Sequence, residues 1–444
     1  MSGAAHWKSV LAEVDQAGLC SHPIRLRGIK LDRSSGELSE GTIVVACKDR
    51  RAAVCPSCSR LYRADAWQLV AAGIRGGKGV DPSVAEHPQL FVTLTAPSFG
   101  AVHRSGGRQG RLAPCRPRRS GGHCPHGRSL SCLERHGEGD AVVGDPMCAD
   151  CFAYSAAVLW NAHVPLLWQR TCHRLFREVA ASPALTSAQA RQLVRLSYFK
   201  VAEFQARGLV HLHVVLRADG RSGPAEAPPS WLDAAALSRA IEAAVARTEV
   251  AVRGPASVSL DRVRWGRQLD VRVLVGDGDS DAGAIAGYIG KYASKTADGT
   301  AGLAHRIRSR GELERLDLRA HLLAMVRTAW TLGGRRNLAA LRLRDHAHTL
   351  GYPGQFSSKS VAYSTTFGAL RRARADYVDG LWGARPDYDG EWRYAGRGYD
   401  SAEAETLARA LLDATVSARN GARRSPSAST ATSTPTSTMG STEP

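Results

Sequence analysis

The strongest candidate for chemistry is a pair of histidines, His211 and His213, in the segment GLVHLHVVLR. Residues two apart on a β-strand point to the same face, so both imidazoles would share one face of this strand. Leu212 and Val214 would then point into the core. Two neutral imidazoles on one face form half of a divalent-metal site. We therefore predict that this strand carries a metal site.

A third ligand is expected across a hairpin from the histidine pair. Gly208 favours a three-residue loop over 206–208, because such loops end in a left-handed residue that glycine adopts readily. In that register Glu203 lies directly opposite His211, on the same face. We predict that His211, His213 and Glu203 bind one cation. A second pair, His346 and His348, falls in a segment that reads as a helix; there residues two apart diverge by about 200°, so we do not expect it to bind a metal.

The segment DAGAIAGYIGKYASKTAD predicts a helix that carries two tyrosines one turn apart, Tyr288 and Tyr292. Lys291 and Lys295 each follow a tyrosine by three residues and so lie near it. A tyrosinate can attack phosphorus and form a stable phosphotyrosine ester. A neighbouring ammonium can stabilise the phenolate or the phosphate oxygens. These four side chains are our candidate catalytic residues.

The chain contains ten cysteines, several of them at metal-ligand spacing. Two Cys-x₂-Cys pairs together suffice for a tetrahedral zinc ribbon, with further Cys and His residues between them for a second site. Cys47 can replace any thiolate of the first site, whereas Cys20 and Cys172 have no partner at a suitable spacing. We expect structural Zn²⁺ with the pairing left open. The candidate ligands are Cys55, Cys58, Cys148 and Cys151, and between them Cys115, Cys124, His126, Cys132 and His136.

Composition points to a polyanionic partner in the cytoplasm. The 444 residues contain 59 Lys and Arg against 41 Asp and Glu, which gives a net charge of +18 and a pI near 9.9. The first residues include no apolar leader, and no run of eighteen apolar residues follows, so neither export nor a membrane span is expected. Thiols stay reduced in the cytoplasm, which favours metal binding over disulfides.

The basic residues are unevenly distributed along the chain. Residues 301–376 contain fourteen Lys and Arg against five acids, a surplus that suits phosphate contacts. A second basic stretch holds Arg116, Arg118 and Arg119. We predict that a basic helical region from about 313 to 376 binds duplex DNA. Its candidate contacts are Arg335, Arg336, Arg342, Arg344, Arg371, Arg372 and Arg374.

Hydrophobic patterns predict an α+β fold. Apolar β-branched runs indicate strands, and periodic Ala-rich segments indicate helices. The predicted strands are 89–96, 196–203, 210–217 and 263–275. The predicted helices are two between 150 and 181, one over 232–252, one over 281–296, and most of the chain beyond 313.

Three of these segments, FVTLTAPS, LVHLHVVL and YIGKYASK, resemble the three motifs of the HUH endonucleases in their order along the chain. The surrounding sequence is similar to the actinobacterial plasmid replication initiators of RepSA type. The stretches that carry this similarity include CRPRRSGGHCPHGRSLSC, FKVAEFQARGLVHLHVVLR and SSKSVAYSTTFGALRRAR. The resemblance spans about residues 20–378.

The resemblance implies an HUH-endonuclease fold: a five-stranded antiparallel sheet with helices, and the two histidines on a central strand. It also implies Mg²⁺ or Mn²⁺ at the predicted ligands, Thr93 and Thr95 beside them, and Tyr292 as nucleophile with Lys295. Single-tyrosine initiators carry a glutamate where this chain has Tyr288. The Tyr-x-x-Lys-Tyr-x-x-Lys string looks more like the two-tyrosine phage initiators, so the one- and two-tyrosine mechanisms both stay open.

The expected function is rolling-circle initiation: nicking one strand at a plasmid origin, forming a 5′-phosphotyrosine and a free 3′-OH primer, and rejoining later. Duplex and single-stranded origin DNA are the expected partners. Because no Gly-x-x-x-x-Gly-Lys-Ser/Thr loop is present, a host helicase and polymerase would assist. The alternatives are an HUH transposase or relaxase, and a non-catalytic zinc-bearing DNA-binding regulator.

The expected organisation has five parts. They are an N-terminal region with zinc-ribbon-like elements and the first Cys-x₂-Cys pair (1–85), the nuclease domain (86–300) with a zinc insertion at about 110–152, the basic helical region (301–380), a C-terminal extension (381–420) and a disordered Ser/Thr/Pro tail (421–444).

Overall fold

The computed structural model describes most of the chain, and its described residues form two compact units. The smaller unit combines residues 1–47 with 387–444, and the larger unit is 48–386. The described residues are 3–32, 36–108, 111–118, 121–137, 139–252, 260–274, 279–294, 305–382 and 388–424.

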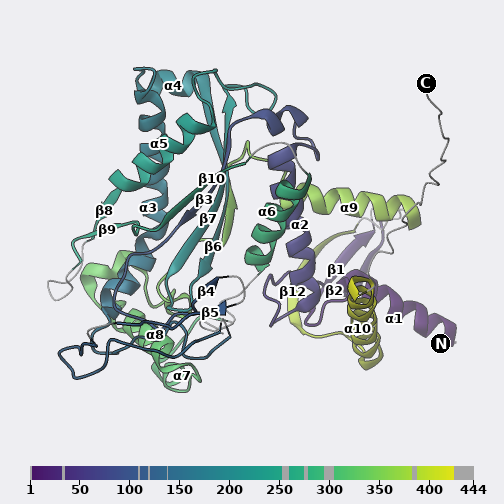
Figure 1. The fold of residues 1–444 in the computed structure, drawn as a ribbon. Helices are drawn as coiled ribbons and strands as arrows, with labels where there is room; N and C mark the ends of the chain where they lie inside the picture. The colour runs from purple at the N-terminus through teal and green to yellow at the C-terminus, as the bar shows by residue number, and fades with distance from the viewer. Residues whose placement is uncertain are drawn as a thin grey trace, which may run out of the picture. The chain divides into compact units, whose positions relative to one another are not determined.

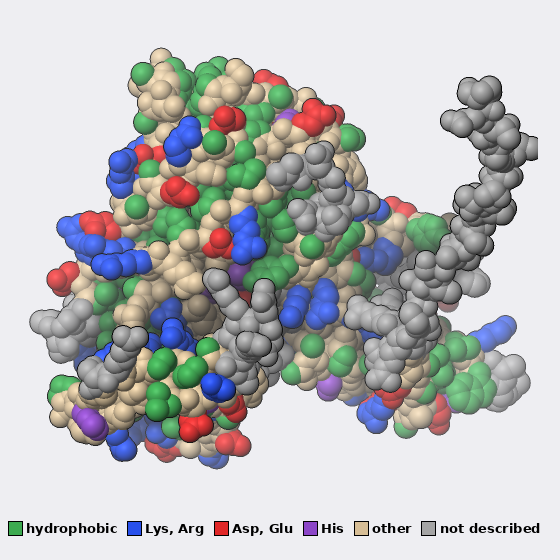
Figure 2. All heavy atoms as spheres, viewed as in Figure 1, with side chains coloured by type: hydrophobic (Ala, Val, Ile, Leu, Met, Phe, Trp, Pro, Cys, Tyr) green, Lys and Arg blue, Asp and Glu red, His purple; other side chains and the backbone are tan. Residues whose placement is uncertain are grey.

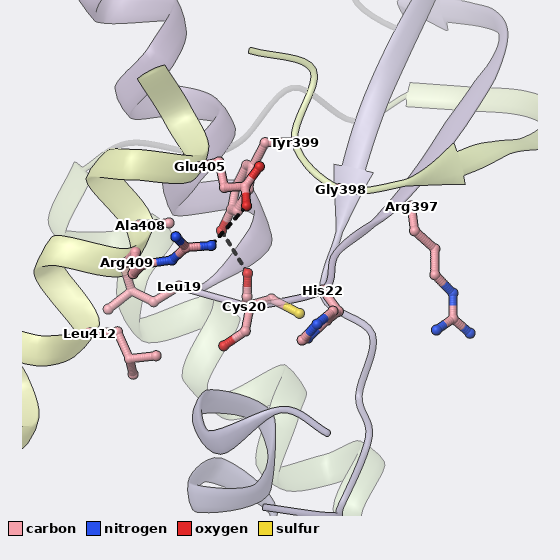
Figure 3. A pocket seen from close by; sticks show the side chains of 11 residues that line it. Leu19, Cys20, His22, Arg397, Gly398, Tyr399, Glu405, Ala408, Arg409 and Leu412 are labelled. Atoms are coloured by element: carbon pink, nitrogen blue, oxygen red, sulfur yellow. Dashed lines mark hydrogen bonds and ion pairs between the residues drawn. The ribbon is translucent and has the colours of Figure 1, made fainter. Parts of the chain in front are cut away.

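The smaller unit is a three-stranded antiparallel sheet with two helices. The strand order is β12–β1–β2, and α1 packs against α10 and β2 (Figure 1). Tyr399 donates a hydrogen bond to the Cys20 carbonyl (3.0 Å) beside a cavity of about 450 Å³, and among the described residues none of the predicted site residues lines it (Figure 3). The elements are α1 (Gly3–Ala17), β1 (Ile24–Asp32), β2 (Leu38–Val45), β12 (Tyr388–Arg397) and α10 (Ala402–Arg424).

The larger unit is built on a five-stranded sheet in which every neighbouring pair is antiparallel. The order is β10–β3–β7–β6–β11, so the strand with both histidines is central, as the family resemblance implied. The strands are β3 (Gln89–Leu94), β6 (Val194–Phe204), β7 (Val210–Gly220), β10 (Leu269–Val273) and β11 (Ser357–Lys359). This arrangement confirms the mixed α+β class.

Helices cover both faces of this sheet, as Figure 1 shows. On one face Leu212 and Val214 of β7 join the main hydrophobic core with α3 (Tyr154–Ala181), α5 (Ala234–Arg247) and α8 (Ala320–Leu332). On the other face Phe91 and Val215 pack with α2 (Pro56–Arg75) and α6 (Asp279–Ser294). The histidines belong to this second face, because side chains alternate along β7.

Between β3 and α3 the chain makes a long insertion over residues 101–151. In the part of it that the structure describes, the strands are the two-residue β4 (Gly107–Arg108) and β5 (Arg111–Leu112). Among its described residues, the buried apolar side chains are all cysteines, with no buried aliphatic or aromatic side chain. The insertion therefore has no hydrophobic core of its own.

Shorter elements complete the larger unit. They are η1 (Pro82–Glu86), α4 (Ser187–Leu193), β8 (Glu249–Ala251), β9 (Arg262–Arg264), α7 (Arg310–Glu314), η2 (Arg336–Leu341), η3 (Ala347–Thr349) and α9 (Phe367–Trp382). None of the helices in the described residues is both long enough and apolar enough to span a membrane.

Two predicted elements between residues 150 and 275 differ from the structure. The two helices expected between 150 and 181 are one continuous helix, α3, with Pro165 inside it. Burial of most of the α3 side chains against the sheet outweighs the hydrogen bond that proline removes. The strand expected over 263–275 is divided into β9 and β10 by Gly266, whose backbone bonds to Thr95 instead (2.8 Å).

The prediction of a mostly helical region beyond 313 is wrong for residues 333–366. Gly333 ends α8, and the only helical elements of residues 333–366 are the short 3₁₀ turns η2 and η3, with Arg342 and Leu350 in the left-handed region. Its strand β11 supplies the fifth strand of the sheet. The basic region is therefore part of the larger unit rather than an appended domain.

The unit boundaries also differ from the expected ones. Residues 48–85 belong to the larger unit, and residues 388–424 share a unit with the N-terminal strands. The predicted tail begins inside α10, and its residues 425–444 lie outside the described residues. The Cys55–Cys58 pair starts a long helix rather than a ribbon: Pro56 occupies its first turn, and Cys55 Sγ accepts from the Cys58 amide (3.5 Å).

Candidate active site and metal clusters

The hairpin between β6 and β7 has the predicted register. Gly208 is left-handed (φ +75°), the Gln205 amide donates to the Leu209 carbonyl (2.9 Å), and Glu203 pairs with His211. Local loop chemistry thus places the carboxylate opposite the first histidine. This confirms the geometric part of the prediction.

His213 contacts several side chains on this face. Its Nδ1 lies 3.3 Å from Thr93 Oγ1, and its Nε2 lies 3.7 Å from Glu203 Oε2. The ring of His211 is 4.3 Å away between centroids. The ring of Phe91 lies parallel to that of His213 at 5.8 Å, which fixes the orientation of the imidazole. Thr93 therefore orients a ligand candidate, whereas Thr95 bonds to the Gln268 carbonyl (2.5 Å).

His211 has the character of a metal ligand. Its buried Nδ1 has no hydrogen-bond partner among the described residues. Burial, reinforced by His213, lowers the pKa of His211 to about 4, so the ring is neutral at pH 7, the form that binds metals. Two imidazoles and a carboxylate fit a divalent cation. The ligand atoms of His211, His213 and Glu203 do not all lie within 4.8 Å of one another.

The tyrosine helix, α6, lies against this face. The Tyr288 hydroxyl is 3.4 Å from His213 Nε2, with the rings nearly perpendicular at 5.0 Å, and Tyr288 is 40% exposed. With the His213 proton on Nδ1, Nε2 can accept from Tyr288. Lys291 is exposed on the same helix. The Tyr292 side chain and all of Lys295 lie outside the described residues.

Close packing between helices holds α6 in place. Trp67 of α2 donates to the Gly283 carbonyl (3.4 Å), and a Cβ on Gly290 would lie 3.3 Å from the Arg63 carbonyl oxygen. Further along α2, a Cβ on Gly73 would overlap the Tyr363 ring, 2.1 Å from its nearest atom. Gly290 therefore lets α6 approach α2 closely, and Gly73 lets α2 approach the ring of Tyr363.

Sequence reasoning missed a buried ionic network on the same sheet. Arg217 and Asp219 on β7 are fully buried and paired (2.6 Å), and Asp219 also lies 2.9 Å from His87 Nδ1. Arg217 also donates to the Gly73 carbonyl of α2. The only sequence signal is the Arg-x-Asp at the end of an otherwise apolar strand. Its contacts are those of a structural clamp between sheet and helix.

The insertion contains two groups of four Cys and His side chains that can hold a metal. In each group the ligand atoms lie within 4.8 Å of one another. The pairing corrects the expected ribbon, because Cys148 and Cys151 group with residues of the insertion and not with Cys55 and Cys58. The groups are His103, Cys115, Cys132 and His136, and Cys124, His126, Cys148 and Cys151.

His103 is a ligand candidate that sequence reasoning missed. It stands alone in a basic, glycine-containing stretch, twelve residues before Cys115, so no spacing pattern marks it. Cys20 has no cysteine partner at a suitable spacing in the sequence, but the structure gives it one. In the smaller unit its Sγ accepts a hydrogen bond from the Cys47 amide (3.3 Å). Cys172 is a partly buried cysteine that belongs to neither group, and desolvation raises the pKa of its thiol to about 12.

A cleft of about 660 Å³ lies beside the histidine hairpin. It is bordered by the residues after β3, the insertion and the 206–208 loop, and four arginines line it: Arg104, Arg116, Arg207 and Arg267. Arg207 donates to the carbonyls of Ala96 and Pro97 (2.9 Å each), which ties the hairpin loop to the residues that follow β3. Burial lowers the pKa of Arg207 to about 10, so it stays charged at pH 7.

The predicted duplex-binding arginines are all exposed, but several make contacts within the protein. Arg374 forms an ion pair with the buried Asp65 of α2, Arg342 pairs with Asp345, and Arg344 stacks on Trp330. The remaining four are Arg335, Arg336, Arg371 and Arg372. On the face shown in Figure 2, Lys and Arg side chains stand in several groups with acidic side chains among them.

Comparison with known proteins agrees with the sequence resemblance. The profile of the family described as "Replication initiator protein, pSAM2" matches residues 6–413. A protein of Streptomyces ambofaciens described as "Replication initiator protein" is 38% identical over 438 residues, covering 92% of this chain and 90% of its own. No solved structure matches. Because both matches span nearly the whole chain, it belongs to the pSAM2 family of replication initiator proteins.

Proposed function

We propose that this initiator starts rolling-circle replication of a plasmid by nicking one strand of origin DNA through a tyrosine. The observation that carries the proposal is the contact between Tyr288 and His213 on the face shared with His211 and Glu203. A nucleophile candidate and the ligand candidates meet on one face of the sheet. A protein that only bound DNA would have no need of this set.

In the proposed step a tyrosine oxygen attacks phosphorus, and the bond from phosphorus to the 3′-oxygen breaks. The 3′-oxygen takes up a proton and becomes the primer end, and the phenol proton passes to a neighbouring base or to solvent. The 5′-phosphate remains on the tyrosine, which preserves a phosphoester for later rejoining.

A divalent cation, Mg²⁺ or Mn²⁺, held by His211, His213 and Glu203 would supply Lewis-acid polarisation of the scissile phosphate. The unpartnered Nδ1 of His211 and its lowered pKa support such a role. Thr93 keeps the His213 ring oriented from the neighbouring strand. Tyr292 acts first, and Tyr288, one turn earlier, performs the second transfer.

The arginine-lined cleft beside the hairpin is the proposed path of the single strand that leads to the site. Arg104, Arg116 and Arg267 offer guanidinium groups to its phosphates. Duplex origin DNA binds elsewhere, at the exposed arginines of the 313–376 region. A host helicase and polymerase then extend the primer.

The test is incubation with a labelled single-stranded oligonucleotide that spans the origin, with Mn²⁺. Cleavage, with a labelled product that remains bound to protein after denaturation, supports the proposal. A mobility shift without cleavage, under conditions where a free metal ion is present in excess, would favour a non-catalytic DNA-binding regulator instead.

A further inference from the structure

The two Cys/His groups of the insertion alternate along the chain. The first pair of ligands (His103, Cys115) and the third pair (Cys132, His136) form one group. The second pair (Cys124, His126) and the fourth pair (Cys148, Cys151) form the other. A simple ribbon or two successive zinc knuckles would instead use neighbouring pairs for each site.

We propose that the insertion is a cross-braced module that binds two Zn²⁺ ions, one at each group. Each group offers four sulfur or nitrogen ligands, the number and type that a closed structural zinc site uses. The first site has two thiolates and two imidazoles, and the second has three thiolates and one imidazole. Neither ligand set includes a carboxylate, which Mg²⁺ or Ca²⁺ would prefer.

The distances agree with tetrahedral zinc. Zinc–sulfur and zinc–nitrogen bonds of about 2.3 and 2.0 Å place neighbouring S and N ligands about 3.5 Å apart. In the first group, Cys132 Sγ lies 3.5 Å from His136 Nε2 and Cys115 Sγ lies 3.8 Å from His103 Nδ1. In the second group, His126 Nδ1 lies 3.2 Å from Cys151 Sγ and 3.7 Å from Cys148 Sγ.

The backbone around the ligands is organised as metal sites usually are. Cys115 and Cys132 lie on adjacent extended segments, where Arg116 and Cys132 exchange amide–carbonyl bonds (2.8 and 3.0 Å). His136 has a carboxylate partner, with Asp140 Oδ2 3.2 Å from Nδ1, and such partners orient histidine ligands. This arrangement leaves Nε2 of His136 directed to the thiolate.

The insertion also needs metal for energetic reasons. Its described residues bury no aliphatic or aromatic side chain, so burial of apolar surface cannot offset the entropy of ordering some fifty residues. Two bound zinc ions supply that free energy directly. Because the sites interleave, the loop between Cys115 and Cys132 is tied at both ends and at its tip.

The module is positioned to affect the hairpin. A Cβ on Gly144 would lie 2.3 Å from the Ala206 carbonyl carbon, so the insertion backbone directly contacts the 206–208 loop. Arg319 donates to the Val143 carbonyl (2.9 Å) and the Ala206 carbonyl (2.7 Å), which joins the same two segments. Loss of zinc should therefore loosen the loop next to Glu203 and His211.

Thiol labelling of the full-length protein tests the interleaving. We expect Cys132→Ser to lower the zinc content by one ion per chain and to make Cys115 react with an alkylating reagent, while Cys124 stays protected. Cys148→Ser should also release one ion and expose Cys124 and Cys151, while Cys115 stays protected. Cys172→Ser, outside both groups, is the matched control and should leave the zinc content unchanged. Exposure of Cys148 and Cys151 in the Cys132→Ser chain, with Cys115 still protected, would show successive sites and overturn the proposal.

Cobalt substitution gives a second readout that does not depend on losing a ligand. His126→Cys should keep the metal content of wild type and shift the Co²⁺ d–d bands of the three-thiolate site toward those of a four-thiolate site. His136→Cys should shift the bands of the two-thiolate site toward those of a three-thiolate site. Unchanged bands in both variants, or wild-type protein without zinc when purified without chelator, would contradict the two-site module.

Discussion

His213 connects the parts of the candidate site at the scale of single residues, because it contacts Thr93, Glu203 and Tyr288. The sequence was sufficient to predict this group, since the period of a strand and the conformation of Gly208 are local properties. It was not sufficient to predict the Arg217–Asp219–His87 network or His103. Those residues acquire partners only through contacts between distant segments.

We expect His213→Ala to lower the nicking rate at least about 100-fold, since Lewis-acid stabilisation of a phosphate is worth several kcal/mol. Binding of origin duplex should be unchanged, because the proposed duplex contacts lie elsewhere. His173→Ala, an exposed histidine of α3, is the control and should nick as wild type. A His213→Ala variant that nicks at a comparable rate would remove the metal from the mechanism.

Lys200 on β6 gives a prediction about stability. It is 7% exposed on the α3 side of the sheet, and burial lowers its pKa to about 8. Since its unfolded pKa is near 10.5, the unfolded chain binds more protons between pH 8 and 10.5, so stability should rise with pH in that window. Lys200→Met should raise the free energy of unfolding at pH 7 by about 1–3 kcal/mol. Denaturant titration would measure this gain in the free energy of unfolding, and the gain should shrink as the pH approaches 10. A Lys200→Met variant that is no more stable than wild type at pH 7 would contradict the prediction.

At the scale of elements, the described structure agrees best with the predictions from sequence where local residue patterns determine the backbone conformation. The β6–β7 hairpin has its predicted register, and α6 extends within two residues of its predicted bounds. Residues 333–366 were predicted as helix from their composition but form 3₁₀ turns and an edge strand. Gly333, Gly351 and the pairing of β11 with β6 outweigh helix propensity there.

The packing of α2 over the histidine face can be tested at Gly73. Gly73→Ala introduces a Cβ into the Tyr363 ring and should lower the free energy of unfolding by about 1–3 kcal/mol. Gly287→Ala on α6, where a Cβ meets no atom within 4 Å, should raise it by up to about 1 kcal/mol, as Ala favours helix. Thermal and denaturant unfolding compare the two. Equal effects of both substitutions would show that α2 does not pack closely at Gly73.

At the scale of the whole molecule, the excess of positive charge defines the interaction with DNA. The net charge of +18 predicts binding that weakens steeply with salt. The organisation into units could not be predicted, because residues 24–45 and 388–397 form one sheet although more than three hundred residues separate them. Pairing of such distant strands has no local signature.

Arg371 and Arg372 test the predicted duplex surface without disturbing Arg374, which pairs with Asp65. Replacing both with Ala should weaken duplex binding and reduce the slope of log affinity against log salt by about 2, one counterion for each lost contact. Arg116→Ala with Arg118→Ala provides the comparison at the second basic stretch. An unchanged slope in the first variant, with a reduced slope in the second, would move the duplex surface to the insertion.

The most direct test of the mechanism is to map the covalent adduct formed with a single-stranded origin oligonucleotide and Mn²⁺. We predict a phosphotyrosine at Tyr292, absent in Tyr292→Phe, with the adduct largely intact in Tyr288→Phe but its second transfer impaired. The Tyr288–His213 contact predicts that Tyr288 is required for that transfer. A modified Tyr288 with Tyr292 unmodified would reverse the assignment, and cleavage that leaves no DNA attached to either tyrosine would contradict the covalent mechanism itself.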